Sequence, residues 1–144
     1  MIIFLDQPKE YLMKKVLFFT LLMIITGLII SCSKTEKPKT QAHVAHILIM
    51  YQGSMRAPAE VTRTQEEALA LAQDVRKMAL AGDDFAELAK KYSDGPTKVR
   101  GGELSPFGRG VMAPAFEEAA FTLKKGQISE VVETDFGYHI IKGL

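Results

Sequence analysis

The stretch from Thr64 to Gly82 restricts the possible folds more than any other part of this sequence. Thr64 followed by Glu67 forms a capping box, in which each side chain bonds the backbone N–H of the other residue at a helix start. Apolar side chains then recur at helical spacing on one face, at Ala68, Leu71, Ala72, Val75, Met78 and Ala79. Gly82 supplies a stop. An amphipathic helix of this kind must bury its apolar face, so the rest of the domain has to provide a matching surface.

Short segments rich in β-forming residues provide that surface. We expect strands at 43–51, 103–107, 128–133 and 137–142. Pro106 would restrict the second of these to a sheet edge or a bulge. A second helix is expected after Asp83 as its cap, and a short third helix after Pro114. The order β-α-α-β-α-β-β predicts an α+β domain in which helices cover a small antiparallel sheet.

Residues 1–31 are typical of an export signal that precedes this domain. Two lysines come before an uncharged apolar run, 16–30, which is too short to span a bilayer comfortably. The first twelve residues fit no part of such a signal, so translation is expected to begin at Met13. The run resembles a bacterial lipoprotein signal, in which Cys32 becomes the acylated first residue of the mature chain. An uncleaved membrane anchor is the alternative, and either reading places the domain outside the cytoplasm.

The polar, lysine-bearing segment 32–42 predicts a lipidated flexible tether, followed by the folded domain at 43–144. The resemblance to a lipoprotein signal implies a lipid anchor that holds the domain on the periplasmic side of a bacterial envelope, and Ser33 after the acylated cysteine is compatible with sorting to the outer membrane. Because Cys32 is the only cysteine, no intramolecular disulfide can form, and lipidation leaves no thiol for nucleophilic chemistry.

The charge balance excludes one class of partner. Residues 32–144 hold fifteen Lys and Arg against fifteen Asp and Glu, which gives no net charge. A nucleic-acid-binding domain would carry a basic patch or stripe, and none is visible here. We therefore expect no nucleic-acid partner.

Five motifs in order make the folded part resemble the parvulin family of peptidyl-prolyl isomerases. They are "AHILI" at 45–49, "DDFAELAKKYSDGPT" at 83–97, "GGELSPFGRGVMAPAFEEAAF" at 101–121, "LKKGQISEVV" at 123–132 and "TDFGYHIIK" at 134–142. The resemblance implies a four-stranded antiparallel sheet wrapped by three to four helices. It also implies an enzyme that isomerises X-Pro bonds without a cofactor, since twisting a peptide bond requires no covalent chemistry.

The resemblance assigns an apolar pocket for the proline ring. Leu104, Met112 and Phe116 match the family's ring pocket, and we expect Phe107 to bind substrate with them. The alternative is that these side chains belong to the hydrophobic core and bind nothing.

Three polar residues match the family's hydrogen-bond network beneath the bound peptide: His46, His139 and Thr134. Period-2 alternation puts His46 on the same side of its strand as Leu48. Whether the pair stabilises the transition state or only supports the structure stays open. A metal site formed with His43 is not expected, because residues three apart on a strand point to opposite faces.

The sequence departs from the family after Ser93. Many parvulins carry cysteine or aspartate where this chain has Gly95. The adjacent Asp94 is a candidate catalytic carboxylate if the loop shifts its register, or else the cap of a turn before Pro96. The loop after the first strand offers Arg56 and Arg63 but no basic cluster, so we expect little selectivity for phosphorylated substrates.

Two functions are compatible with the sequence. The first is a monomeric isomerase for proline-containing polypeptide clients in the cell envelope. The second is a non-catalytic chaperone or peptide-binding module that uses the same groove. The histidine pair and the ring pocket favour the first, whereas Gly95 favours the second.

Overall fold

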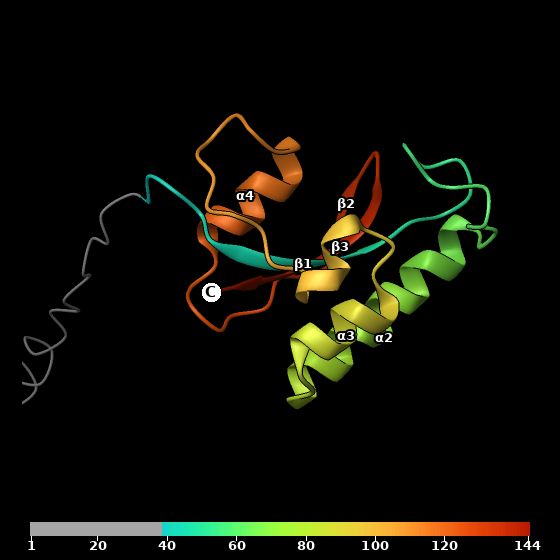
Figure 1. Ribbon diagram of the computed structural model, residues 1–144, viewed down its shortest axis with the longest axis horizontal. Helices are drawn as coiled ribbons and strands as arrows, with labels where there is room; N and C mark the ends of the chain where they lie inside the picture. Colours follow the sequence, from blue (N-terminus) through green and yellow to red (C-terminus); the bar gives the residue numbers. More distant parts are fainter. Residues whose placement is uncertain (1–38) are drawn as a thin grey trace, which may run out of the picture. The chain divides into compact units, whose positions relative to one another are not determined.

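The structure, a computed structural model, describes residues 39–144. The expected signal at 1–31, the start at Met13 and the acylated Cys32 lie outside the described residues. The elements in Figure 1 are β1 (Val44–Ile49), α2 (Gln65–Ala81), α3 (Phe85–Tyr92), the 3₁₀ helix η1 (Pro96–Arg100), α4 (Pro114–Thr122), β2 (Val132–Thr134) and β3 (Gly137–Gly143). Across this part of the chain no helix is both long enough and apolar enough to cross a membrane.

The strands form an antiparallel sheet in the order β1-β3-β2, which confirms the predicted α+β class. In the β1–β3 pairing, Leu48 lies opposite His139 and His46 lies opposite Ile141. The tight turn between β2 and β3 places Thr134 opposite Gly137. This register brings the middle of β1 beside the middle of β3.

The segment 103–107, predicted as a strand, is not continuous in the structure. It runs beside β1 and the residues just before it and bonds them at separate points: Leu104 N–H donates to the Val44 carbonyl of β1 at 3.0 Å, and Ala42, ahead of β1, exchanges bonds with Phe107 at 2.9 and 3.0 Å. Pro106 has no N–H to contribute, which explains why the ladder breaks here. The expected four-stranded sheet is therefore three strands with an irregular fourth edge.

The predicted first helix is confirmed in both its ends. Thr64 and Glu67 form the capping box of α2, and Gly82 ends the helix with a left-handed φ of 105°. The predicted cap of the next helix was wrong by one residue, since the Asp84 carboxylate accepts from Glu87 N–H at 2.9 Å. Asp83 still belongs to the end of α2, because its N–H donates to the Met78 carbonyl at 3.2 Å.

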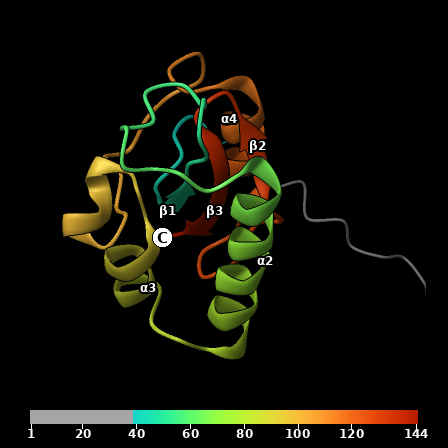
Figure 2. The ribbon, with the colours of Figure 1, turned by 90° about the vertical axis from the view of Figure 1, so that its right-hand side faces the viewer.

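Alternation along the strands divides the core between two faces of the sheet. Figure 1 shows α4 on one face with α2 and α3 on the other, and Figure 2 shows α2 and α3 on the same side of the strands, away from α4. Ile47, Ile49 and Ile140 pack with the buried faces of α2 and α3. Val44 and Ile141 pack instead with α4. Side chains at even positions of β1 and odd positions of β3 therefore face α4.

Candidate active site

A cavity of about 110 Å³ lies on the α4 face of the sheet. It is several times larger than the volume that one water molecule occupies in the liquid. The side chains around it are His46, Leu104, Met112, Ala113, Phe116, Phe136 and His139. Five of these seven side chains are apolar, so the cavity suits a small apolar group.

The structure brings the three predicted ring-pocket residues together around this cavity. Leu104 comes from the irregular edge beside β1, Met112 from the loop before α4, and Phe116 from the first turns of α4. Phe116 is only 4% exposed, and Leu104 and Met112 pack against the same core cluster. These side chains therefore border the core and also line the cavity, so a place at the core does not by itself exclude a binding role.

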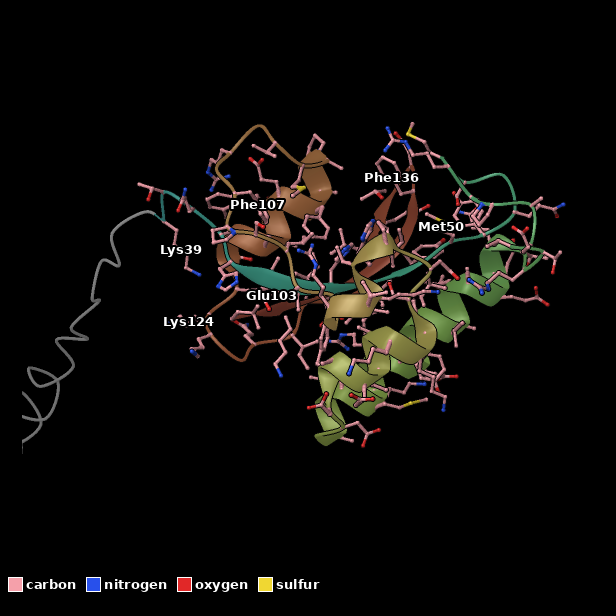
Figure 3. The ribbon with its side chains drawn as sticks, in the orientation of Figure 1. Lys39, Met50, Glu103, Phe107, Lys124 and Phe136 are labelled. Atoms are coloured by element: carbon pink, nitrogen blue, oxygen red, sulfur yellow. The ribbon has the colours of Figure 1, made fainter. Side chains whose placement is uncertain are left out.

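Phe107, also predicted to bind substrate, lies behind the cavity instead of lining it. Figure 3 labels its side chain beside α4. The Phe107 ring is buried, and its centroid lies 6.3 Å from that of Phe116. Phe107 therefore packs near the Phe116 ring and does not itself line the cavity.

His46 and His139 form the polar floor of the cavity. They are diagonal neighbours on β1 and β3 and face the same side of the sheet. Their Nδ1 atoms are 3.3 Å apart, and the rings are stacked with centroids separated by 5.5 Å. The Phe116 ring stands edge-on to both imidazoles, at 5.4 and 5.1 Å between centroids. The arrangement fixes both imidazoles against one wall of the ring pocket.

A threonine hydroxyl lies at each end of this pair. The predicted Thr134 places Oγ1 at 2.8 Å from His139 Nε2. Thr97, which the sequence analysis missed, places Oγ1 at 3.0 Å from His46 Nε2. It belongs to η1, within a glycine- and proline-rich stretch that carries no periodicity, so the sequence held no signal for it. All four ring nitrogens of the two histidines therefore have a partner: the Nδ1 atoms face each other, and each Nε2 faces a threonine hydroxyl.

Burial determines the protonation of the pair. Desolvation lowers the pKa of His46 to about 4. Desolvation, and after it the like charge of His46, lowers the pKa of His139 to about 3. Both imidazoles are therefore neutral at pH 7, and each has one N–H donor and one acceptor nitrogen.

Gly102 fixes the backbone that carries His46. Its carbonyl accepts from the His46 N–H at 2.9 Å. Its φ is +82°, and a Cβ at this position would lie 2.2 Å from the His46 carbonyl oxygen. Only glycine combines this conformation with so close an approach.

The structure does not bring Asp94 to the cavity. Its Oδ2 accepts from Met50 N–H at 2.8 Å, and its carboxylate pairs with Arg63. The alternative role as a turn cap goes to another residue, because Gly95 N–H donates to the Ser93 hydroxyl at 3.2 Å. Asp94 thus ties the loop before α2 to the end of β1. Gly95 has an ordinary φ of −73°, so its backbone conformation does not require glycine.

Phe136 closes the cavity on the side of the β2–β3 turn, where Figure 3 labels it. The loop after β1 packs on this turn, since Met55 N–H donates to the Asp135 carbonyl at 2.7 Å. The Arg56 guanidinium lies 5.7 Å from the centre of the Phe136 ring. The loop after β1 therefore lies next to the cavity.

His43 takes no part in the pair. Its Nε2 lies 2.9 Å from an Oε1 of Glu103, on the exposed surface. Within residues 39–144 no group of three or more His, Cys, Asp or Glu side chains is placed to hold a metal ion.

Comparisons with known proteins identify the family of this domain. A family profile, the PPIC-type PPIase domain, matches residues 28–143. The foldase protein PrsA of Caldanaerobacter subterraneus subsp. tengcongensis is 57% identical over 72 residues, which are 49% of this chain and 24% of that protein. The peptidyl-prolyl cis-trans isomerase Pin1 of Malus domestica is 42% identical over 111 residues, covering 71% of this chain and 92% of that protein.

Solved structures of similar proteins share the fold. The solution structure of TbPIN1 has a TM-score of 0.67 and 34% identity, over 74% of this chain and 98% of that one. The crystal structure of PrsA from Bacillus cereus has a TM-score of 0.59 and 34% identity, over 95% of this chain and 47% of that one. The chain spans about a quarter of the curated foldase it matches. The profile match and the shared fold establish that the chain belongs to the PPIC-type peptidyl-prolyl cis-trans isomerases, the parvulins.

Proposed function

We propose that this domain accelerates the cis-trans isomerisation of X-Pro bonds in extended polypeptides. The observation that carries the proposal is the apolar cavity of about 110 Å³ above the histidine pair. A proline side chain is a compact apolar ring, and this cavity offers it apolar contacts on most sides. The peptide bond before that proline would then lie at the mouth of the cavity, next to the two imidazoles.

The reaction requires a site that prefers the twisted bond over the planar one. The uncatalysed barrier is about 18–20 kcal/mol because twisting removes the resonance of the amide. The twisted bond has less charge separation between oxygen and nitrogen, so apolar surroundings disfavour it less than they disfavour the planar bond. Each tenfold of acceleration requires about 1.4 kcal/mol of such preference.

The histidine pair would contribute by its fixed position, without attacking the substrate. All four of its ring nitrogens are engaged by each other or by the hydroxyls of Thr97 and Thr134. None of them has a proton or a lone pair left for a nucleophilic step. This supports a non-covalent mechanism that uses shape and desolvation.

Isomerisation measured by NMR exchange on short X-Pro peptides tests the proposal. We expect saturable acceleration by the wild-type domain. The variant Met112→Ala, which opens one wall of the cavity, is expected to lose about tenfold or more in kcat/KM, equal to about 1.4 kcal/mol. Leu80→Ala is the matched control, because Leu80 is an exposed apolar residue on α2 and faces away from the site.

The same experiment separates the two candidate functions. Binding of the peptides without acceleration would refute the isomerase and support the non-catalytic peptide-binding module. If the domain neither binds the peptides nor accelerates their isomerisation, both functions are refuted.

Substrate selection is expected to depend little on phosphorylation before the proline. Arg63 is paired with Asp94, and Arg56 lies over the Phe136 ring. Isolated arginines bind phosphate less well than a cluster does. Rates measured on matched Ser-Pro and phosphoserine-Pro peptides should differ by less than about threefold; a preference above about tenfold, equal to about 1.4 kcal/mol, would contradict this.

We also propose that the domain works as a lipid-anchored monomer in a bacterial envelope, on exported clients. Support comes from the signal-like segment 1–31, the single Cys32 and the similarity to proteins named foldases. Metabolic labelling with a palmitate analogue, compared between wild type and Cys32→Ser, tests the anchor. Equal labelling of both proteins, or none in either, would contradict it. Light scattering of residues 39–144 measures the molar mass in solution, and the mass of a dimer would contradict the monomer.

A further inference from the structure

Thr97 lies at one end of a series of hydrogen bonds that runs through His46 and His139 to Thr134. We propose that Thr97 is a positioning residue whose hydroxyl donates to His46 Nε2 and thereby fixes the tautomers of both histidines. The tautomer assignment stands on the hydrogen-bond geometry of the two neutral imidazoles, whereas its effect on catalysis rests on the proposed isomerase function.

The hydrogen-bond geometry allows only two arrangements of the protons between Thr97 and Thr134. Thr97 Oγ1 lies 3.0 Å from His46 Nε2, the two Nδ1 atoms are 3.3 Å apart, and His139 Nε2 lies 2.8 Å from Thr134 Oγ1. A neutral imidazole has one N–H and one acceptor nitrogen. Each histidine that donates on one side must therefore accept on the other, so all the protons point from Thr97 to Thr134 or all point back.

The surroundings of the two hydroxyls select the direction. Thr134 Oγ1 accepts from Phe136 N–H at 3.2 Å and lies 3.5 Å from the Gly137 carbonyl, to which its own proton can go. Thr97 is buried, and among residues 39–144 its hydroxyl has no acceptor within reach except His46 Nε2. In the reverse direction His46 would donate to Thr97, and the Thr97 proton would be left without an acceptor inside the protein.

The forward direction therefore satisfies every proton. Thr97 donates to His46 Nε2, His46 donates through Nδ1–H to His139 Nδ1, and His139 donates through Nε2–H to Thr134. An unpaired buried donor is costly, which makes the reverse chain unfavourable. Thr97 does not line the cavity, so it would act on the substrate only through the orientation of His46.

Proton-detected ¹⁵N spectra of the imidazoles read the tautomers directly. We expect a protonated Nδ1 on His46 and a protonated Nε2 on His139 in the wild-type domain. Thr97→Val, which keeps the shape and removes the hydroxyl, should populate the other tautomer of His46 and lower kcat about tenfold with little change in KM, the loss expected for one hydrogen bond. Thr97→Ser should restore both the spectrum and the rate to within about twofold, since it keeps the hydroxyl. Thr122→Val is the matched control, because it removes an exposed hydroxyl at the end of α4.

Three results would overturn the inference. They are a wild-type spectrum with His46 protonated on Nε2, a Thr97→Val variant with unchanged tautomers, and a Thr97→Val variant with changed tautomers at the wild-type rate. If the valine variant fails to fold, the wild-type and serine spectra still decide the assignment. A wild-type domain with the expected tautomers but without acceleration would refute the proposed function and support the assignment.

Discussion

Mild acid should destabilise this domain through the buried histidine pair. Both pKa values are lowered in the folded state, to about 4 for His46 and about 3 for His139, from about 6.5 in an unfolded chain. Between these values the unfolded chain binds protons that the folded domain excludes. The resulting stability is complete above pH 6.5 and is lost as the pH falls below it.

The magnitude follows from the size of the shifts. At pH 5 an unfolded histidine is almost fully protonated, while both native histidines are still largely neutral. Lowering the pH from 7 to 5 then costs about 2 kcal/mol for each histidine and about 4 kcal/mol for the two. This is a large part of the roughly 5–15 kcal/mol that stabilises an ordinary domain.

Urea denaturation followed by far-ultraviolet circular dichroism measures this loss, since the chain has no tryptophan for fluorescence. The variant His139→Asn removes one buried imidazole and should lose only about half as much stability over the same pH range. His43→Gln is the control, because it removes an exposed histidine outside the buried pair.

Two outcomes would refute this reasoning. One is a wild-type domain whose free energy of unfolding changes by less than about 1 kcal/mol between pH 7 and 5, against the roughly 4 kcal/mol expected. The other is a His139→Asn variant with the full wild-type pH dependence, which would assign the effect to groups outside the pair.

Three further substitutions test the packing around the site, each by its free energy of unfolding in urea. Phe116→Ala should cost about 3–5 kcal/mol because it removes a buried ring, and a loss below about 1 kcal/mol would show that the site collapses to fill the space. Gly102→Ala should cost clearly more than Gly53→Ala, because both glycines have positive φ but only the Cβ at position 102 would meet backbone atoms; equal losses would contradict the close approach to His46. Asp94→Asn should cost about 1–3 kcal/mol by leaving the half-buried Arg63 without its counter-charge, and an unchanged stability would show that the ion pair contributes nothing.

Local patterns in the sequence determined where α2 begins and ends and which side chains share a face of β1. The capping box at Thr64 and the stop at Gly82 involve only residues within one turn of each other, so their positions could be predicted without the fold. The alternation along β1 likewise placed His46 on the side of Leu48, as the structure has it. The pairing of His46 with His139 came from the family resemblance, because these residues are 93 positions apart.

Contacts between distant residues were decided by the tertiary structure alone. Thr97 meets His46 across 51 positions, and Asp94 meets Arg63 across 31. Each contact depends on how a loop without periodicity settles against the sheet, and nothing in the neighbouring residues specifies that path. The break in the edge at 103–107 has the same origin, since a ladder forms only where two backbones run at matching distance and Pro106 interrupts one of them. Hydrogen bonds between near neighbours can be predicted from the sequence, whereas those that close the site require the packed sheet and loops to bring their partners together.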